Sequence, residues 1–374
     1  MGIKNLKTIL NTYCKCAINK RKLSDYSGMV IAIDISIYLY KYLYNNNDHL
    51  EGLSRFSLRL LKNNITPLFI FDGKPPKEKN EILQGRKDKR NVYINKKDEL
   101  KNILVQRDMI DKGIEIQEPI IEEEEISELT NIELQKEIDK LEKKIIFVKG
   151  FHIESAKKMF DLFGIKYMVA NGEAEQLCAQ LCKSNIVDGC ISEDTDILAN
   201  GGHLFLINFN ADNNNIEEYC LIGILECLEI DYNQFIDLCI LCGCDYTSKI
   251  NGVGPITAYK LIKKHKNIEN IIEEIKQISK YTVPDNFDYI KARELFNIKL
   301  SEELLLELKD ELLIKKPNST ELISYLKENS SSIKNRYINE ITNNLDSYYN
   351  NIISIKNNNN NNNIIEHSEL NELN

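Results

Sequence analysis

The sequence predicts an α/β fold with a mainly parallel central sheet that is flanked by helices. Three continuous apolar runs have strand character, namely Met29–Ile33, Pro67–Phe71 and Ile186–Ile191. Helix-prone segments alternate with these runs, and continuous apolar runs are typical of strands that are covered on both faces. The 374 residues contain no run of 18 apolar residues, so we expect no membrane span.

Each predicted strand leads to a carboxylate. The first run ends at Asp34, before a predicted helix at 35–44 and an amphipathic helix at 53–63. The second run ends at Asp72, and the third leads into Asp194. Because ligands of open α/β sheets bind beyond the carboxyl ends of the strands, we expect these side chains to converge at one edge of the sheet.

The stretch 171–198 holds four carboxylates, which are Glu173, Glu175, Asp194 and Asp196. Its first part predicts a helix from Glu173 to Lys183 with Asn171 or Gly172 as the N-cap. The two aspartates face the same way if the chain around them stays extended. Taken alone, the stretch also has an ordinary interpretation, because glutamates complement a helix dipole and aspartate is common in loops.

A cluster of carboxylates with no neighbouring His or Cys nucleophile favours metal-dependent chemistry. Such a cluster repels itself unless cations bind, and oxygen-only ligands suit Mg²⁺ or Mn²⁺. Paired ions can activate water and stabilise the leaving oxygen of a phosphodiester. We therefore expect metal-dependent hydrolysis of phosphodiesters.

The net charge of −9 is concentrated in one segment. Residues 115–142 carry eleven acidic residues against two lysines, so the rest of the chain sums to zero. Basic residues gather at 1–22, with six Lys/Arg and no acid, and at 249–266, with five lysines and no acid. A third cluster, at 74–101, has ten basic against five acidic residues. Such clusters indicate phosphate contacts, although each also fits a solvated helix face.

Residues 77–147 predict a helical cap that is inserted after the second strand. The segment is charged and helix-prone, with breaks at Gly113 and Pro119. The tetrad Glu122–Glu125 within it is interpreted as a solvated face rather than a metal site.

Residues 245–266 predict a hairpin turn and a following basic helix that bind duplex DNA independently of sequence, which corresponds to the helix–two-turn–helix implied by the family resemblance given below. Its turn, Ile250-Asn-Gly-Val-Gly-Pro255, joins an apolar helix to a basic one. The two glycines let the backbone approach a phosphate, whose charge the next helix N-terminus and its lysines stabilise. The predicted DNA-binding residues are Gly252, Gly254, Lys260, Lys263 and Lys264.

Ten cysteines, without a signal peptide, suggest a reducing intracellular compartment. Two groups could be proposed as zinc ligands: Cys178 with Cys182, and Cys239 with Cys242 and Cys244. Both groups fall in apolar helical contexts with no matching Cys/His cluster, so we interpret them as small buried side chains.

Together these residues resemble the flap endonuclease family of structure-specific 5′ nucleases over residues 1–349. The matching motifs are the opening Met-Gly-Ile-x-x-Leu, Asp34 after its strand, Phe71-Asp72-Gly-Lys-Pro-Pro, Gly172-Glu173-Ala-Glu175, Ser192-Glu-Asp194-Thr-Asp196, Gly243-Cys-Asp245-Tyr, Gly252-Val-Gly254-Pro255, and Val283-Pro-Asp-Asn-Phe287 with Leu295-Phe296.

The resemblance implies a PIN-like 5′-nuclease fold, with the cap as an arch, and two Mg²⁺ ions for which Mn²⁺ can substitute. The implied metal ligands are the seven carboxylates Asp34, Asp72, Glu173, Glu175, Asp194, Asp196 and Asp245. By motif position, Lys79 and Arg86 match the basic pair that engages the scissile phosphate. Tyr40 matches an aromatic residue that stacks near the cleavage site, although ordinary packing would also explain it. A K⁺ ion at the 250–254 turn would help to hold duplex DNA.

The implied organisation is one nuclease domain, 1–349, followed by a disordered asparagine-rich tail, 350–374. The domain comprises an N-terminal region (1–98), the cap (77–147), an internal region (148–285) and C-terminal helices (286–349).

Two features depart from the family pattern. The acidic segment 115–142 is unusual for a cap that admits a single strand. Residues 342–349 resemble a sliding-clamp-binding box with Leu345, Tyr348 and Tyr349 in place, but Thr342 stands where the family has Gln. The alternative for this box is a helix end with two incidental tyrosines.

We expect an intracellular, monomeric enzyme that cleaves 5′ flaps and acts as a 5′-3′ exonuclease on nicked or gapped DNA. It would act in replication and repair, in the nucleus or at a viral or cytoplasmic replication site. One alternative is a four-way-junction resolvase or excision nuclease of the same superfamily. Another is a catalytically inactive DNA-binding adaptor, against which the complete carboxylate set argues.

Overall fold

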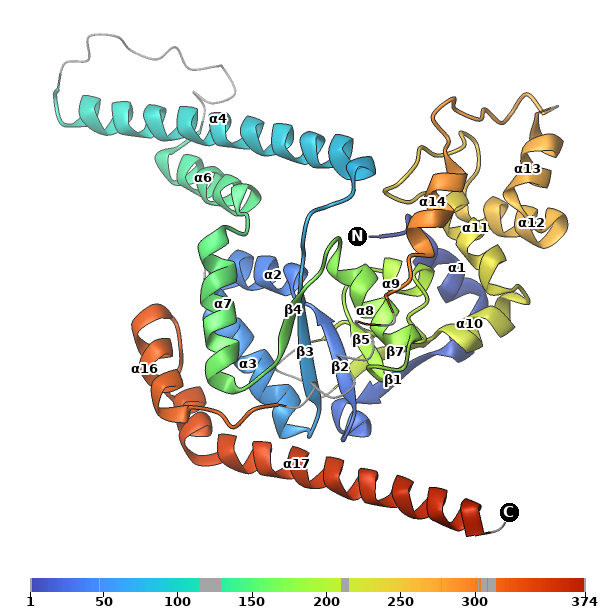
Figure 1. Cartoon of the computed structure of the whole chain (residues 1–374). Helices are drawn as coiled ribbons and strands as arrows, with labels where there is room; N and C mark the ends of the chain where they lie inside the picture. The colour runs from blue at the N-terminus through green and yellow to red at the C-terminus, as the bar shows by residue number, and fades with distance from the viewer. Residues whose placement is uncertain are drawn as a thin grey trace.

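A mixed, mainly parallel sheet lies at the centre of the computed structural model (Figure 1), which describes residues 2–46, 48–114, 129–209, 215–276, 278–301, 303, 308 and 314–372. Within these residues seven strands form one sheet in the order β1-β7-β6-β5-β2-β3-β4. Pairing is parallel from β6 to β4, whereas β7 is antiparallel to both β6 and β1. The predicted fold class is therefore confirmed. The strands are β1 (Ile18–Lys22), β2 (Val30–Asp34), β3 (Thr66–Phe71), β4 (Tyr167–Val169), β5 (Gly189–Ile191), β6 (Leu204–Ile207) and β7 (Asn215–Cys220).

The three predicted strands form the middle of the sheet. β2 and β3 have almost the predicted bounds, because their continuous apolar residues are buried between helices on both sides. The third strand is shorter than expected and begins at Gly189. Ile186 and Val187 instead donate backbone hydrogen bonds to Leu181, which close the end of the preceding helix.

Alternate residues of the central strands enter two different cores. On one face Ala32, Leu68 and Ile70 pack in one hydrophobic cluster, and on the other Ile33 and Phe69 pack in a second. This alternation follows from the period of two along a strand, and it places helices on both faces. Figure 1 shows the two helical layers on either side of the sheet.

The helices of the first layer are α1 (Leu6–Tyr13), α8 (Ala174–Lys183), α9 (Asp196–Ala199), α10 (Leu221–Leu228), α11 (Tyr232–Cys242), α12 (Pro255–His265), α13 (Ile268–Ile275) and α14 (Tyr289–Phe296). Those of the second layer are α2 (Ser36–Asn46), α3 (His49–Lys62), α7 (Gly150–Phe163), α16 (Ser319–Asn329) and α17 (Asn335–Glu372). Three short 3-10 turns are η1 (Lys15–Ala17), η2 (Leu23–Tyr26) and η3 (Lys77–Lys79).

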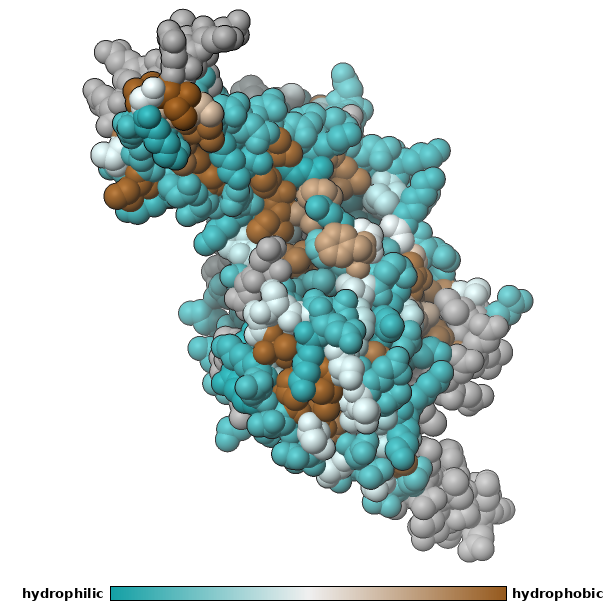
Figure 2. Space-filling view, turned by 90° about the vertical axis from the view of Figure 1, so that its left-hand side faces the viewer, coloured by the Kyte–Doolittle hydropathy of each residue, from teal (hydrophilic) through white to brown (hydrophobic). Residues whose placement is uncertain are grey.

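The cap consists of two long helices that project from the body, α4 (Asn80–Asp111) and α6 (Asn131–Ile145). They pack on each other through their own small core, in which Leu100, Ile103 and Ile138 are buried. Figure 2 shows that apolar side chains also gather on the surface of the cap. Ile110 at the end of α4 and Ile132 at the start of α6 are both exposed. The predicted helical cap is thus confirmed on both sides of residues 115–128. The tetrad Glu122–Glu125 lies outside the described residues.

The C-terminal tail differs from the prediction. We expected disorder from residue 350, whereas α17 continues through Asn335–Glu372. Ile352 is only 1% exposed and packs in the second core seven residues after Leu345, which is also buried. The helical period of apolar residues therefore extends past the predicted boundary, which explains the continued helix.

Part of the N-terminal basic cluster forms an edge strand instead of a free cationic surface. Arg21 on β1 forms an ion pair with Glu218 on β7, with 3.5 Å between Nε and Oε1. Glu218 also accepts a hydrogen bond from the Tyr26 hydroxyl. Among the described residues, no helix is both long enough and apolar enough to cross a membrane.

Candidate metal centre and nucleic-acid cleft

The carboxyl ends of β2 and β3 bring Asp34 and Asp72 together, and Ser36 joins them. The Ser36 amide donates to Asp34 Oδ1 at 3.1 Å, and its hydroxyl donates to Asp72 Oδ2 at 2.5 Å. Ser192, which follows β5, donates its hydroxyl to Asp34 Oδ2 at 3.0 Å. These bonds fix the orientation of two predicted metal ligands, Asp34 after β2 and Asp72 after β3, and one of the donors, Ser192, follows β5.

A close backbone contact at Gly73 aligns Asp72 with α8. The Gly73 amide donates to the Gly172 carbonyl at 2.8 Å, and a Cβ on Gly73 would lie 1.8 Å from the Ala170 carbonyl oxygen. Only glycine fits such an approach. Asp72 Oδ1 then accepts a hydrogen bond from the Ala174 amide at 2.8 Å, so Asp72 satisfies an N-terminal donor of α8.

Glu173 and Glu175 lie at the start of α8, and both are only 8% exposed. The predicted N-cap was wrong, because Glu173 itself is the N-cap residue and the helix begins at Ala174. Glu173 Oε2 accepts a hydrogen bond from the Tyr246 hydroxyl at 2.8 Å, and Gln176 donates to that hydroxyl. Both positions fit the ordinary interpretation that glutamates complement the helix dipole, and their burial beside other carboxylates also fits a cation site.

Asp194 and Asp196 follow β5 and close the cluster. Asp194 Oδ1 accepts a hydrogen bond from the Asp196 amide at 3.0 Å, because the chain turns here into α9, so the condition of an extended chain is not met. Glu175, Asp194 and Asp196 each present a carboxylate oxygen within 4.8 Å of the others. Gly2, with φ of +87°, packs so closely that a Cβ would meet Asp194 Oδ1 at 1.9 Å.

The Lys79 ammonium contacts three of the carboxylates. One of them is Asp245, which follows α11 and is joined to the two glutamates at the start of α8 through this lysine. The ammonium contacts Glu173, and it lies 3.5 Å from Glu175 Oε1 and 3.6 Å from Asp245 Oδ2. Lys79 is 8% exposed, whereas the side chain of Arg86, on α4, is 56% exposed. Arg86 Nη2 lies 3.8 Å from Asp245 Oδ2, so the two basic residues contact the cluster from the base of the cap.

The cluster carries more negative charge than its surroundings neutralise. Burial, followed by repulsion from Asp72, raises the pKa of Asp34 to about 7. Burial and neighbouring carboxylates also hold the pKa values of Glu175 and Asp196 well above their ordinary range. Burial acts to lower the pKa of Lys79, but Glu175 and Glu173 outweigh it and raise that pKa. Asp196 Oδ1 is buried with no hydrogen-bond donor, which is a position that a cation would satisfy.

These residues line a cleft of about 840 Å³ between the sheet edge and the cap. Tyr40 on α2 lines the same cleft, is 41% exposed, and stacks on Tyr44 with 6.2 Å between ring centroids. Its exposed position in the cleft favours the stacking role over ordinary packing. The cap side of the cleft is basic and aromatic, with Lys89, Arg90, Tyr93, Lys144 and Phe147.

The predicted helix–two-turn–helix consists of α11, an irregular turn and α12. Gly252 has φ of +83°, and a Cβ there would lie 2.6 Å from the Lys280 carbonyl oxygen, whereas Gly254 has open space around it. Lys260 is exposed. Lys263 bonds to Glu229 at 2.6 Å, and Lys264 lies 3.3 Å from Glu274. Two of the three predicted phosphate-binding lysines therefore already have carboxylate partners.

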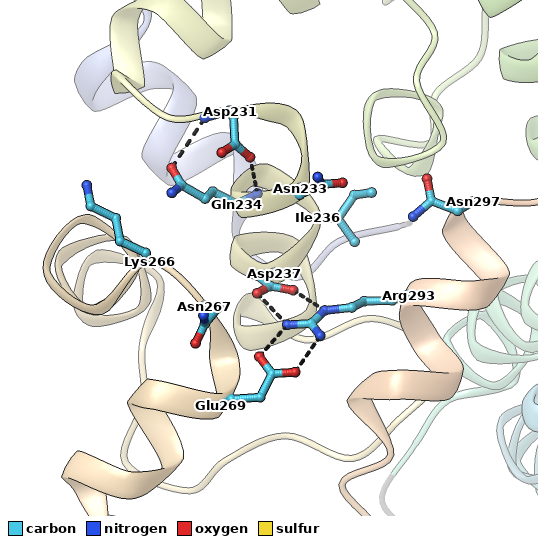
Figure 3. Close-up of a pocket in the computed structure, with 10 residues that line it drawn as sticks. All are labelled: Asp231, Asn233, Gln234, Ile236, Asp237, Lys266, Asn267, Glu269, Arg293 and Asn297. Carbon is cyan, nitrogen blue, oxygen red and sulfur yellow. Dashed lines mark hydrogen bonds and ion pairs between the residues drawn. The ribbon is translucent and has the colours of Figure 1, made fainter.

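A second pocket, of about 480 Å³, lies behind this motif and is stabilised by ion pairs (Figure 3). The Arg293 guanidinium donates to both oxygens of Asp237, at 2.5 and 2.6 Å, and also to Glu269. Asp237 Oδ2 additionally accepts a hydrogen bond from the Ile268 amide. The network ties α11, α13 and α14 together.

The cysteines named as possible zinc ligands are buried free thiols. In the described part of the chain, the only group of three potential ligands whose donor atoms converge within 4.8 Å is the carboxylate trio. The interpretation of these cysteines as small buried side chains therefore stands.

The box at 342–349 lies within α17. Leu345 is 1% exposed and packs in the second core, while the Tyr348 hydroxyl donates to Glu340 at 3.0 Å. Tyr349 packs at the edge of the same core. The box therefore lies inside a helix and not at a helix end, and its leucine and tyrosines pack on the protein's own second core.

Sequence reasoning missed the residues that orient the ligands. Ser36, Ser192 and Tyr246 each donate to a predicted ligand, and Gly2 and Gly73 allow close backbone approaches. Four of the five lie inside the family motifs quoted above and Ser36 lies two residues after Asp34, and these positions are the one signal that could have found their roles.

Two family domains match the chain: the XPG N-terminal domain at residues 1–92 and the XPG I-region at residues 164–245. Flap endonuclease 1 of Enterocytozoon bieneusi is 36% identical over 312 residues, which cover 79% of this chain and 77% of that protein.

Solved structures share the fold. Flap endonuclease-1 from Methanococcus jannaschii matches with a TM-score of 0.59 and 22% identity, over 90% of this chain and 96% of that one. Human GEN1 in complex with Holliday junction DNA matches with a TM-score of 0.60 and 18% identity, over 93% and 78%. Identities this low show the fold alone, whereas the relative at 36% identity shows the family. The chain therefore belongs to the flap endonuclease family.

Proposed function

We propose that this chain is a structure-specific 5′ flap endonuclease that hydrolyses DNA phosphodiesters with two Mg²⁺ ions. The observation that carries the proposal is the cluster of carboxylates, six of which line the cleft while Asp196 adjoins Glu175 and Asp194, with Lys79 and Arg86 beside them. Membership of the flap endonuclease family supports the reaction class and the substrate. A 5′-3′ exonuclease activity on nicked or gapped DNA is part of the same proposal.

The donor set fits divalent cations. All seven side chains offer oxygen only, four of them (Asp34, Glu173, Glu175 and Asp196) are buried, and Asp196 Oδ1 has no hydrogen-bond donor. We assign Asp34, Asp72, Glu173, Glu175, Asp194, Asp196 and Asp245 as the residues that would hold the ions, directly or through water. When bound, Mg²⁺ or Mn²⁺ would activate water and stabilise the leaving oxygen.

The remaining side chains of the cleft bind and orient the substrate. Lys79 and Arg86 offer cations for the scissile phosphate, one from inside the cluster and one from its rim. Tyr40 offers an exposed ring against which a nucleotide at the cleavage site can stack. No protein nucleophile is required, since water attacks the phosphorus.

The helix–two-turn–helix would hold the downstream duplex independently of sequence. The backbone at Gly252 and Gly254 and the exposed Lys260 are the groups that we assign to phosphate contact. The family resemblance suggests a K⁺ ion at the 250–254 turn, which replacing K⁺ by a bulky organic cation at constant ionic strength would test through duplex affinity.

One experiment tests the central proposal. Labelled 5′-flap, nicked and four-way-junction DNAs are incubated with wild type, Asp72→Ala, Asp194→Ala and Glu273→Ala, with Mg²⁺ or with EDTA. Glu273 is an exposed glutamate of α13 outside the cleft and is the matched control. We expect Mg²⁺-dependent flap cleavage by wild type and Glu273→Ala only. No Mg²⁺-dependent product from wild type would contradict the nuclease assignment.

The same experiment separates the rivals. A preference for four-way junctions would favour a resolvase, the activity suggested by the structural likeness to GEN1. DNA binding without cleavage would favour an inactive adaptor. Neither rival has support beyond the shared fold, whereas the flap assignment has support from the sequence relatives.

Sliding-clamp binding stays a prediction, as do the monomeric state and a site of action at nuclear or viral replication. Because Leu345 is 1% exposed, clamp binding through the box would require part of α17 to leave the core. A clamp pull-down that is unaffected by the double change Tyr348→Ala and Tyr349→Ala would count against it.

A further inference from the structure

Phe147 is an aromatic residue of the cleft that the carboxylate mechanism does not use. It lies in the segment between α6 and α7, lines the cleft opposite the carboxylates, and is 43% exposed. The large buried phenylalanines, such as Phe69 and Phe160, are at most 2% exposed and stack on each other in the core. An apolar ring that lines a polar cleft is therefore available to a ligand with a flat aromatic face.

Two cations from different segments lie over this ring. The Arg90 guanidinium, on α4, lies 4.3 Å from the ring centroid, and the Lys149 ammonium, at the start of α7, lies 5.5 Å from it. An aromatic face with cations beside it matches a nucleotide, because the ring complements the base and the cations complement the adjoining phosphates. The carboxylates deeper in the cleft are assigned to the cations that receive the scissile phosphate, so the basic cap side is the favourable place for a neighbouring nucleotide.

We infer that Phe147, with Arg90 and Lys149, forms a binding site for one unpaired nucleotide of the 5′ strand. The inference rests on the proposed flap endonuclease function and names a further positioning residue for it. A base within a duplex already stacks on both of its faces, whereas an unpaired base has a face free for Phe147. The site therefore favours substrates with an unpaired strand and tolerates any base, since every base has such a face.

The test measures KM for 5′-flap DNAs that lack one base at the first, second or third unpaired position. Wild type, Phe147→Ala, Phe147→Trp and the control Phe151→Ala are compared. Phe151 is a nearby phenylalanine, 62% exposed, that does not line the cleft. For wild type, Phe147→Trp and Phe151→Ala we expect one abasic position to raise KM about five- to tenfold with kcat little changed.

On intact DNA, we expect Phe147→Ala to have the same raised KM that wild type has on the abasic DNA. The abasic position should not raise the KM of Phe147→Ala any further. Equal penalties for Phe147→Ala and wild type at all three positions would overturn the inference. Failure of the proposed function would look different, because wild type would then cleave none of the substrates.

A separate observation concerns two thiols far from the cleft. Cys16 in η1 is exposed, Cys227 on α10 is half-buried, and their Sγ atoms lie 2.8 Å apart across 211 residues of sequence. Neighbouring Cys14 is fully buried, and burial raises its pKa to about 12, which keeps it in the unreactive thiol form. Cys16 and Cys227 are thus the pair that is placed for reaction.

The geometry points to a reversible modification site at which a hydroperoxide oxidises Cys16 and Cys227 to a disulfide. The Cys16 thiolate attacks the peroxide, the O–O bond breaks, and a sulfenic acid and an alcohol or water result. The Cys227 thiol then attacks that sulfur, the S–S bond forms and water leaves. Residues close to each cysteine contact Tyr259 of α12. Tyr13, three residues before Cys16, packs on the Tyr259 ring at 4.7 Å between centroids, and the carbonyl of Leu228, next to Cys227, accepts a hydrogen bond from the Tyr259 hydroxyl.

The test treats wild type, Cys16→Ser and the control Cys220→Ser with hydrogen peroxide, followed by peptide mapping without reductant and thermal unfolding. We expect a linked Cys16–Cys227 peptide in wild type and Cys220→Ser, together with a Tm raised by more than about 4 °C that dithiothreitol reverses. Cys16→Ser should show neither change. Absence of the linked peptide from oxidised wild type, or a peptide that links Cys14 or Cys220 instead, would overturn the proposal.

Discussion

Two buried acidic clusters of this protein differ in how their charge is balanced. Around Asp237, one guanidinium and one backbone amide supply donors to both carboxylate oxygens (Figure 3). In the cleft, seven carboxylates gather around Lys79 and Arg86, and Asp196 Oδ1 has no donor. The comparison shows that burial of a carboxylate does not by itself indicate a metal site. A carboxylate whose charge is paired with a cation inside the protein has a structural role, whereas a cluster with excess negative charge can bind cations.

The largest expected effect is the loss of catalysis when the uncompensated cluster loses a ligand. Asp194→Asn keeps the shape of the side chain but removes one charge, and we expect kcat/KM on a 5′ flap to fall at least about a hundredfold. Since the change also relieves repulsion, Tm in EDTA should not fall. A Tm that drops together with the activity would mean that Asp194 is structural, like Asp237.

The reverse pattern is expected for the paired cluster. Asp237→Ala removes one of the two carboxylate partners of the Arg293 guanidinium, whose side chain is 28% exposed and still bonds to Glu269, and we expect a loss of about 2 kcal/mol in the free energy of unfolding. Urea unfolding measures this loss. At a temperature where the variant is still folded, kcat on a 5′ flap should stay within about threefold of wild type. Arg293→Lys, which keeps the charge but loses the bidentate geometry, is the milder matched variant.

The pH dependence of stability should report the charge of Asp34, which a comparison of Asp34→Asn with wild type isolates, because burial raises the pKa of Asp237 as well. In EDTA the folded state holds a proton on Asp34 up to about pH 7, whereas the unfolded state releases it near the ordinary pKa of about 3.9. The folded state therefore binds more protons in this window, and its stability falls as pH rises from about 4 to about 7. We expect the Tm of Asp34→Asn, measured relative to the Tm of wild type, to rise as the pH increases from about 4 to about 7.

Mg²⁺ should remove this gain, because the ions stabilise folded wild type by mass action, by about 2.7 kcal/mol at a hundredfold excess over Kd. Thermal unfolding at several pH values, with EDTA or Mg²⁺, provides both measurements. A Tm difference that does not change with pH would contradict the description of Asp34 as an uncompensated buried acid.

The smallest expected effect concerns lysines of α12 that differ only in their partners. Lys260 is exposed, whereas the Lys263 ammonium bonds to Glu229 at 2.6 Å. Lys260→Ala should reduce the slope of log affinity for duplex DNA against log salt by about one. Lys263→Ala should leave that slope unchanged, because its charge is already paired. Equal slopes for the two variants would show that the Glu229 pair does not persist in solution.

The part of the site that could be predicted is the part that has a local signature in the chain. Asp34 and Asp72 follow continuous apolar runs, and they converge as expected because ligands bind at the carboxyl ends of parallel strands. Asp245 and Lys79 were assigned by motif position, and both lie in the cluster. The edge strand β1 was missed, because its polar sequence Ile-Asn-Lys-Arg-Lys has no apolar pattern and depends on pairing with β7.

Pairing between residues that are distant in sequence was beyond prediction. Glu229 neutralises Lys263 from 34 residues away, and Arg293 neutralises Asp237 from 56 residues away. Neither pair has a local signature, so sequence alone could not tell a free lysine from a paired one. The same limit explains the clamp-binding box, whose Leu345 is a core residue only because α17 packs on α3.

The measurement that tests the central claim most directly is a count of bound divalent cations. Titration with Mn²⁺, followed by electron paramagnetic resonance of the free ion, gives the number of ions that each variant binds. We predict two ions per wild-type chain, two for Asp237→Asn, and a loss of at least one for Asp194→Asn. Equal binding by Asp194→Asn and wild type would contradict the claim that the cleft cluster is the metal centre.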